Sequence, residues 1–153
     1  MSDEPRESGR DGIGVWTKRC YFAGRAVMDS ALRPYELGSV QWYVLHQLVH
    51  DGPTMQRDLV RLLGIERATM TSLVATLVRK GLVEQESDKA DQRQRLLRIT
   101  PTGAKLWGEL PDLSFIRSAA FDGIDEADIA TVVRVLRAAT ERLENISRKG
   151  TLS

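Results

Sequence analysis

The chain has 153 residues, which suits one domain, and its hydrophobic content of 42% is ordinary for a globular protein. No apolar run approaches the roughly 20 residues of a membrane-spanning helix, and the polar start of the chain does not resemble a signal peptide. The single cysteine, Cys20, excludes an internal disulfide and suits a reducing compartment, so we expect a cytoplasmic protein without a membrane partner.

The first helix is expected over Ile13 to Leu32, after a start at residues 1–12 whose composition is typical of disorder. Apolar side chains cover much of the helix circumference, and Pro34 then forces a break. A helix of this kind needs more partners than one small domain provides. We therefore expect it to pack against a second copy of the chain.

A second helix is expected within Tyr35 to Asp51, with Gly38 or Ser39 as its cap and the turn Asp51-Gly52-Pro53 at its end. A third, short helix follows. Thr54 can cap this helix, and Gly64 suits the left-handed position at its end. Its apolar positions are Met55, Leu59, Leu62 and Leu63.

A fourth helix is expected from about Glu66 to Lys80, because four apolar residues recur at spacings of three and four: Met70, Leu73, Val74 and Leu77. They predict one buried face. The opposite face is small, polar or basic, with Arg67, Ala68, Thr71, Ser72, Ala75 and Arg79. Such a face can enter the major groove of DNA, because bulk would block the approach and acids would repel phosphate. A merely solvated helix face is the alternative interpretation.

A two-stranded hairpin is expected next, over Leu82 to Glu86 and Arg95 to Ile99, with a polar tip at Ser87 to Gln94. Thr100-Pro101 suits the start of the following helix. From residue 52 to residue 100 the chain carries nine Lys and Arg against six Asp and Glu. The positive excess therefore falls on the helix pair and the hairpin, whereas the whole chain has a net charge of only +1.

The C-terminal part is expected to be helical from Thr100 to Ala120, with a kink or a split at Pro111. Asp125 can cap a last helix, whose apolar stripe continues to Ile146, before a flexible tail at 148–153. Surplus apolar surface at both ends of the chain predicts a homodimer.

Two segments resemble the MarR family of winged helix-turn-helix regulators: LRPYELGSVQWYVL (Leu32 to Leu45) and GLVEQESDKADQRQRLLRITPTG (Gly81 to Gly103). The most specific part is Asp91-x-Arg93 followed by Leu97-x-Ile99-Thr100-x-x-Gly103. The resemblance spans roughly residues 13–146. It implies a mainly α fold with a small β-hairpin wing. A winged helix-turn-helix unit at about 35–100 would lie between dimerisation helices at about 13–33 and 101–147.

The resemblance implies a regulator of transcription that binds double-stranded DNA sequence-specifically as a homodimer. The two recognition helices would enter grooves about 34–36 Å apart, so the operator should be a pseudo-palindrome. A repressor released by a small ligand is the function we expect. The residues expected at the DNA are Thr54, Gln56, Arg67, Ala68, Thr69, Thr71, Ser72, Ala75, Arg79, Lys89, Asp91, Arg93 and Arg95.

Within this set, Arg67 can make a bidentate contact to guanine, and an arginine of the wing can enter the minor groove. Asp91 can instead orient an arginine, and Arg93 can form a salt bridge within the wing, which leaves Arg95 as the freer DNA contact. The chain departs from the family at Gln85-Glu86, where basic residues are common. This departure weakens any phosphate contact from the first wing strand.

An effector site is expected between the dimer helices and the winged unit. It would be lined by Trp16, Cys20, Trp42, Tyr43 and His46. Aromatic side chains with a polar partner suit an aromatic or phenolic small molecule, and core packing is the alternative. Some members of the family sense peroxides through a cysteine in the first helix, which makes a redox role for Cys20 a second hypothesis. A buried, unreactive thiol is the alternative.

Other classes of function find less support in the residues. His46 and His50 lie four residues apart and could share a helix face, but a zinc site needs two more ligands, and nothing marks them. No metal or cofactor is therefore expected. No HExxH, Walker A, GxGxxG, CxxC or GxSxG motif occurs, so we expect no enzyme and no catalytic residue. A winged domain that binds only a protein partner remains an alternative, and salt-dependent binding to a palindrome would distinguish the two.

Overall fold

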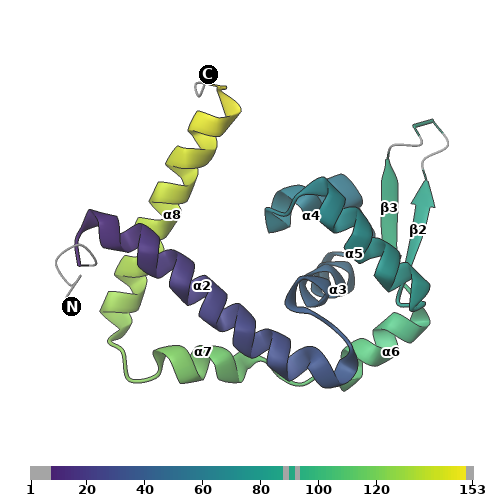
Figure 1. The fold of residues 1–153 in the computed structure, drawn as a ribbon, viewed down its shortest axis with the longest axis horizontal. Coiled ribbons are helices and arrows are strands. Elements are labelled where there is room, and N and C mark those ends of the chain that lie inside the picture. Colours follow the sequence, from purple (N-terminus) through teal and green to yellow (C-terminus); the bar gives the residue numbers. More distant parts are fainter. Residues whose placement is uncertain (1–7, 88–89, 92–93, 151–153) are drawn as a thin grey trace. The chain divides into compact units, whose positions relative to one another are not determined.

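The computed structural model describes residues 8–87, 90–91 and 94–150, which group into two compact units, 1–113 and 114–153. The second unit contains α7 (Ser114–Phe121) and α8 (Glu126–Arg148). No helix in the described part of the chain combines the length and the apolar character needed to cross a membrane. The first unit contains α2 (Arg10–Leu32), η1 (Arg33–Tyr35), α3 (Ser39–Asp51), β1 (Thr54–Met55), α4 (Gln56–Leu63), α5 (Arg67–Arg79), β2 (Val83–Ser87), β3 (Arg95–Ile99) and α6 (Pro101–Glu109) (Figure 1).

Helix α3 is the centre of the first unit, because it packs against α2, α4, α5, α6, β1 and β3. Its residues Val44, Leu45 and Leu48 are buried. They face a core that also includes Leu59 of α4 and Leu97 of β3. The buried face expected for α5 is confirmed. Leu73 is half-buried, and the other three residues are fully buried: Met70, Val74 and Leu77. Burial of these side chains holds α4 and α5 on the central helix.

The sheet has three antiparallel strands in the order β1-β3-β2, where the sequence predicted two. Thr54 pairs with Leu97, and its hydroxyl donates to the carbonyl of Gly52 at 2.9 Å. The expectation that Thr54 caps α4 is wrong, since Met55 occupies the N-cap position. The physical reason is that β3 would otherwise expose an unpaired edge, and the two residues before α4 pair with that edge.

The wing strands β2 and β3 pair from Val83 opposite Ile99 to Ser87 opposite Arg95. The bounds of β3 agree with the prediction, and β2 is displaced by one residue. Val83 and Leu97 are buried beneath the wing, so the strands stand on the core of the unit.

The base of the wing is closed by Thr100, which follows β3. Its hydroxyl donates to the carbonyl of Gly81 at 2.6 Å and accepts from the amide of Gly103 at 2.9 Å, and its own amide donates to the carbonyl of Leu82 at 3.1 Å. Gly103 packs so closely that a Cβ there would collide with the Leu82 carbonyl and lie 2.8 Å from Cγ1 of Ile99. Only glycine fits this position, which explains the Thr100-x-x-Gly103 spacing.

The ends of the chain differ in part from the prediction. Helix α2 begins at Arg10, so residues 10–12 are helical and not disordered, with Gly9 as the N-cap and Asp11 in the first turn. An acidic residue in the first turn favours the helix dipole, which helps the helix to start early. Residues 1–7, also expected to be disordered, lie outside the described residues.

The break expected at Pro111 is confirmed, because α6 ends at Glu109 and α7 begins only at Ser114. The cap expected at Asp125 is also confirmed, since its Oδ1 accepts from the amide of Ala127 at 2.9 Å. Helix α8 ends at residue 148, one residue into the predicted tail.

Helices α2 and α8 leave large apolar side chains exposed. No residue of α8 is buried, and Leu143 is 66% exposed. Such side chains lose contact with water only when another surface covers them. The others are Ile13, Val15, Trp16, Tyr21, Phe22 and Val27 of α2, and Val132, Val133, Val135 and Ile146 of α8.

A first prediction concerns Gly103. The substitution Gly103→Ala should lower the free energy of unfolding by about 3 kcal/mol, because the added methyl group forces the Leu82 carbonyl and the base of the wing apart. Urea denaturation measures this change. Gly108→Ala in the same helix is the matched control, since a Cβ there meets nothing within 4 Å and alanine favours a helix. Equal stability of the two variants would contradict the packing argument.

Candidate nucleic-acid interface

Helix α5 presents a small, polar surface because its apolar residues face the core. Gly64 ends α4 in the left-handed conformation, with φ +62, and the chain turns so that α5 starts at Arg67. With one face of α5 buried, the opposite face points outward. Every residue of α5 that was expected at DNA is exposed: Arg67, Ala68, Thr69, Thr71, Ser72, Ala75 and Arg79.

The two arginines of this helix differ in their engagement. The guanidinium of Arg67 has no hydrogen-bond or ion-pair partner among the described residues, so its fork of donors remains available at the first turn of α5. Arg79 donates to the hydroxyl of Thr76 at 3.3 Å and is held along its own helix. Arg67 is therefore the better placed of the two for a bidentate contact.

The wing carries part of the expected set. Asp91 and Arg95 are exposed, whereas Lys89 and Arg93 lie outside the described residues, as does the salt bridge considered for Arg93. Arg95 is not free, because its Nη1 donates to Oε1 of Gln85 at 3.1 Å. Its remaining N–H groups can still reach a phosphate or the minor groove.

Two half-buried residues at the start of α4 complete the expected set. The hydroxyl of Thr54 is engaged by Gly52, as described above. Gln56 donates through Nε2 to the hydroxyl of Thr71 at 3.3 Å and accepts through Oε1 from Nε2 of Gln85 at 2.8 Å. Gln85 is a residue that the sequence analysis treated only as a missing phosphate contact. Its place in β2, two residues after the buried Val83 and on the same face, is the signal that would have located it under the helices.

The residues expected at the effector site are brought together only in part. The ring of Trp42 lies 5.2 Å from that of Tyr43 and 5.0 Å from that of His46. Two rings that were not expected at this site also belong to the cluster. The ring of Trp107 of α6 lies 5.2 Å from that of Trp42, and the ring of His50 lies 4.1 Å from that of His46. Among the described ring contacts, none joins Trp16 to this cluster.

The other two expected positions lie on α2. Arg19 places its guanidinium 5.1 Å from the ring centroid of Trp16. Cys20 is exposed in the single chain. In the part of the chain that the structure describes, no group of three or more His, Cys, Asp and Glu could hold a metal ion, and we assign no metal centre to His46 and His50.

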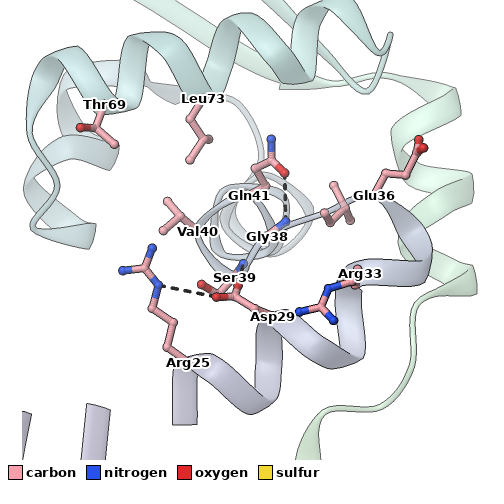
Figure 2. A pocket seen from close by; sticks show the side chains of 11 residues that line it. Arg25, Asp29, Arg33, Glu36, Gly38, Ser39, Val40, Gln41, Thr69 and Leu73 are labelled. Atoms are coloured by element: carbon pink, nitrogen blue, oxygen red, sulfur yellow. Dashed lines mark hydrogen bonds and ion pairs between the residues drawn. The ribbon is translucent and has the colours of Figure 1, made fainter. Parts of the chain in front are cut away.

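A cavity of about 480 Å³ lies where α2, α3 and α5 meet, and none of the residues expected at the effector site lines it (Figure 2). Figure 2 shows Arg25 directed at Asp29, with 3.9 Å between Nε and Oδ2. Oδ1 of Asp29 accepts from the amide of Ser39 at 2.7 Å, and Gln41 accepts from the amide of Gly38 at 3.0 Å. The amides of Gly38 and Ser39 at the start of α3 are thus bonded by side chains of the protein itself.

The winged unit is similar in sequence to a known protein family. A model of the MarR family matches residues 35–94. The chain is 26% identical to BpsR of Bordetella bronchiseptica, whose DNA binding is regulated by 6-hydroxynicotinic acid; the match covers 84% of this chain and 98% of BpsR, with a TM-score of 0.74.

Two further solved structures share the fold at lower identity. A mutant of MarR from E. coli, complexed with operator DNA, is 20% identical over 90% of this chain and 99% of MarR, with a TM-score of 0.75. PcaV of Streptomyces coelicolor, in complex with its natural ligand, is 22% identical over 92% of this chain and 98% of PcaV, with a TM-score of 0.71.

A second prediction concerns His46. Partial burial lowers its pKa below the ordinary 6.5, the neighbouring His50 lowers it further, and Asp51 acts in the opposite direction. The unfolded chain therefore binds the proton more tightly than the folded chain. The contribution of His46 to stability is complete above about pH 6.5 and is lost as the pH falls below that value.

The urea concentration at the unfolding midpoint should therefore decrease as the pH is lowered from about 7.5 to about 5.5. The decrease should be smaller in His46→Gln. Titration of the His46 ring by NMR gives the pKa directly. A midpoint for His46 at or above the ordinary value, or an unchanged pH dependence in the variant, would contradict this prediction.

Proposed function

Because the chain belongs to the MarR family of winged-helix, DNA-binding transcription regulators, we propose that it is a repressor that binds a pseudo-palindromic operator as a homodimer. The observation that carries this proposal is the exposed, small and polar face of α5, with the available guanidinium of Arg67 at its start. Members of the family are DNA-binding regulators and not enzymes. The site of action is then the cytoplasm, where operator DNA is accessible.

The proposed homodimer is supported by the apolar side chains that α2 and α8 expose. In a two-fold dimer both copies contribute the same patch, so apolar side chains of α2 and α8 can be covered by those of the second copy. The dimer also sets the distance between two copies of α5, and half-sites one helical turn apart match that symmetry.

The proposed effector is a small aromatic or phenolic compound that contacts the rings of Trp42, Tyr43, His46 and Trp107. The regulation of BpsR by a hydroxylated aromatic acid supports this chemical class. Release of DNA requires that the effector bind more tightly to a dimer whose recognition helices are wrongly spaced, because only a difference in affinity shifts a population.

A third prediction tests the operator. Selection of preferred duplexes from a random pool, followed by sizing of the bound species, should enrich a pseudo-palindrome bound by one dimer. No enrichment over random DNA at low salt, with Cys20 kept reduced, would contradict the proposed function and favour a winged domain that acts through a protein partner.

A fourth prediction separates two kinds of contact on that operator. Arg67→Ala should cost about 1–3 kcal/mol of binding and relax sequence preference, because a bidentate base contact is lost. Arg95→Ala should weaken binding and lower the slope of log K against log salt by about one, because one phosphate neutralisation is lost. Equal losses for Arg67→Ala on operator and random DNA would contradict a base contact by this residue.

A further inference from the structure

Three hydrogen bonds connect the wing to α5 through two glutamine side chains. Arg95 of β3 donates to Gln85 of β2, Gln85 donates to Gln56 of α4, and Gln56 donates to Thr71 of α5. The donor–acceptor distances are 3.1, 2.8 and 3.3 Å. These four side chains, which we call the glutamine relay, come from four different elements of the unit.

The direction of every bond in the glutamine relay follows from its first member. A guanidinium can only donate, so Gln85 must turn its oxygen to Arg95 and its nitrogen to Gln56. Gln56 must then accept with its oxygen, which leaves its nitrogen for Thr71. The chemistry of arginine thus settles both amide orientations.

The last step determines what Thr71 can do at DNA. Its hydroxyl accepts from Gln56, so its own hydrogen must point to another acceptor. A hydroxyl usually specifies a base weakly because it can either donate or accept. The relay reduces this ambiguity, since it fills one of the two acceptor sites of the Thr71 hydroxyl and leaves the hydroxyl hydrogen to donate.

We propose that Gln56 and Gln85 are positioning residues that make Thr71 a hydrogen-bond donor toward the operator and hold the wing's Arg95 in register with α5. This inference rests on the proposed operator binding through α5 and the wing. The acceptors that Thr71 would select are phosphate oxygens or the major-groove acceptors of guanine, adenine and thymine.

The same arrangement gives a reason for the departure from the family at Gln85. A basic side chain at this position would repel the guanidinium of Arg95 and would have no oxygen to accept its hydrogen bond. The neighbouring Glu86, by contrast, is exposed and pairs with Arg98 at 3.6 Å outside the relay. Gln85 therefore makes no phosphate contact of its own. Its neutral amide instead holds Arg95 and, through Gln56, orients Thr71.

The fifth prediction is a double-mutant cycle on the selected operator, with Thr71→Val and Gln85→Met. Among the described hydrogen bonds, these two residues are linked through Gln56. If their contributions to binding were independent, the two fold-losses would multiply. Each single variant should weaken binding about fivefold, the effect of one lost hydrogen bond. The double variant should weaken it about five- to tenfold, well short of the roughly 25-fold that independent losses would give.

Base preference gives a second readout that a purely structural role would not change. Repeated selection should show that Gln85→Met broadens preference at the same operator position as Thr71→Val. Gln47→Met is the matched control, because the hydrogen bond of Gln47 to Asp51 stays within α3, and it should leave binding within about twofold. Urea midpoints of all variants exclude losses caused by unfolding.

The outcomes separate the relay from the function on which it rests. A wild-type protein that selects no operator contradicts both. A wild-type protein that selects an operator, with multiplicative losses in the cycle or with unrelated base preferences in the two variants, contradicts the relay and leaves the regulator function standing. Should Gln85→Met fail to fold, Gln56→Met in the same cycle with Arg95→Met tests the relay from its other side.

Discussion

The arrangement of the winged unit depends on how Thr100 and Gly103 close the base of the wing. One hydroxyl bonds to the carbonyl before β2 and to an amide of α6, and the glycine lets α6 lie directly against the backbone at Leu82. The end of α5, the start of β2, the end of β3 and the start of α6 therefore meet at one point. Because the wing rises from this junction, these contacts set its direction relative to α5.

The exposed surface of α5 is also determined by packing within the winged unit. The buried face of α5 fixes which residues point outward, and the core around α3 fixes where α5 lies. The glutamine relay then adds direction at the level of single hydrogen atoms, from Arg95 to Thr71. Backbone geometry places α5 and the wing, and side-chain chemistry decides how each of them presents its donors.

Periodicity predicted much of this unit because its strongest patterns coincide with complete burial. Met70, Val74 and Leu77 recur at helical spacing and are fully buried. The pattern was less reliable in α4, where Leu62 was grouped with the apolar positions and is 61% exposed. Leu63 is half-buried, so the buried side of this eight-residue helix includes Leu59 and Leu63 but not Leu62.

The features that sequence reasoning missed depend on contacts without a local pattern. A strand of two residues is too short to show alternation, so the sequence predicts a helix cap at Thr54 and not the strand β1. The amides of Gln56 and Gln85 are 29 residues apart, and Trp107 meets Trp42 from a different helix. The candidate DNA face was predictable because it is the complement of a buried stripe, whereas the relay required the positions of four elements at once.

The short strand β1 also has a consequence for how the unit unfolds. Thr54 and Met55 pair with the middle of β3 and lead without a loop into α4. If the wing opened, β1 would lose its pairing with β3, and the first turn of α4 would be released. Amide hydrogens in the paired part of the wing should therefore exchange only when β1 and the first turn of α4 open as well. In an independent hairpin, the strands open on their own. The paired part of the wing and the start of the helix-turn-helix are therefore expected to open together as one cooperative unit.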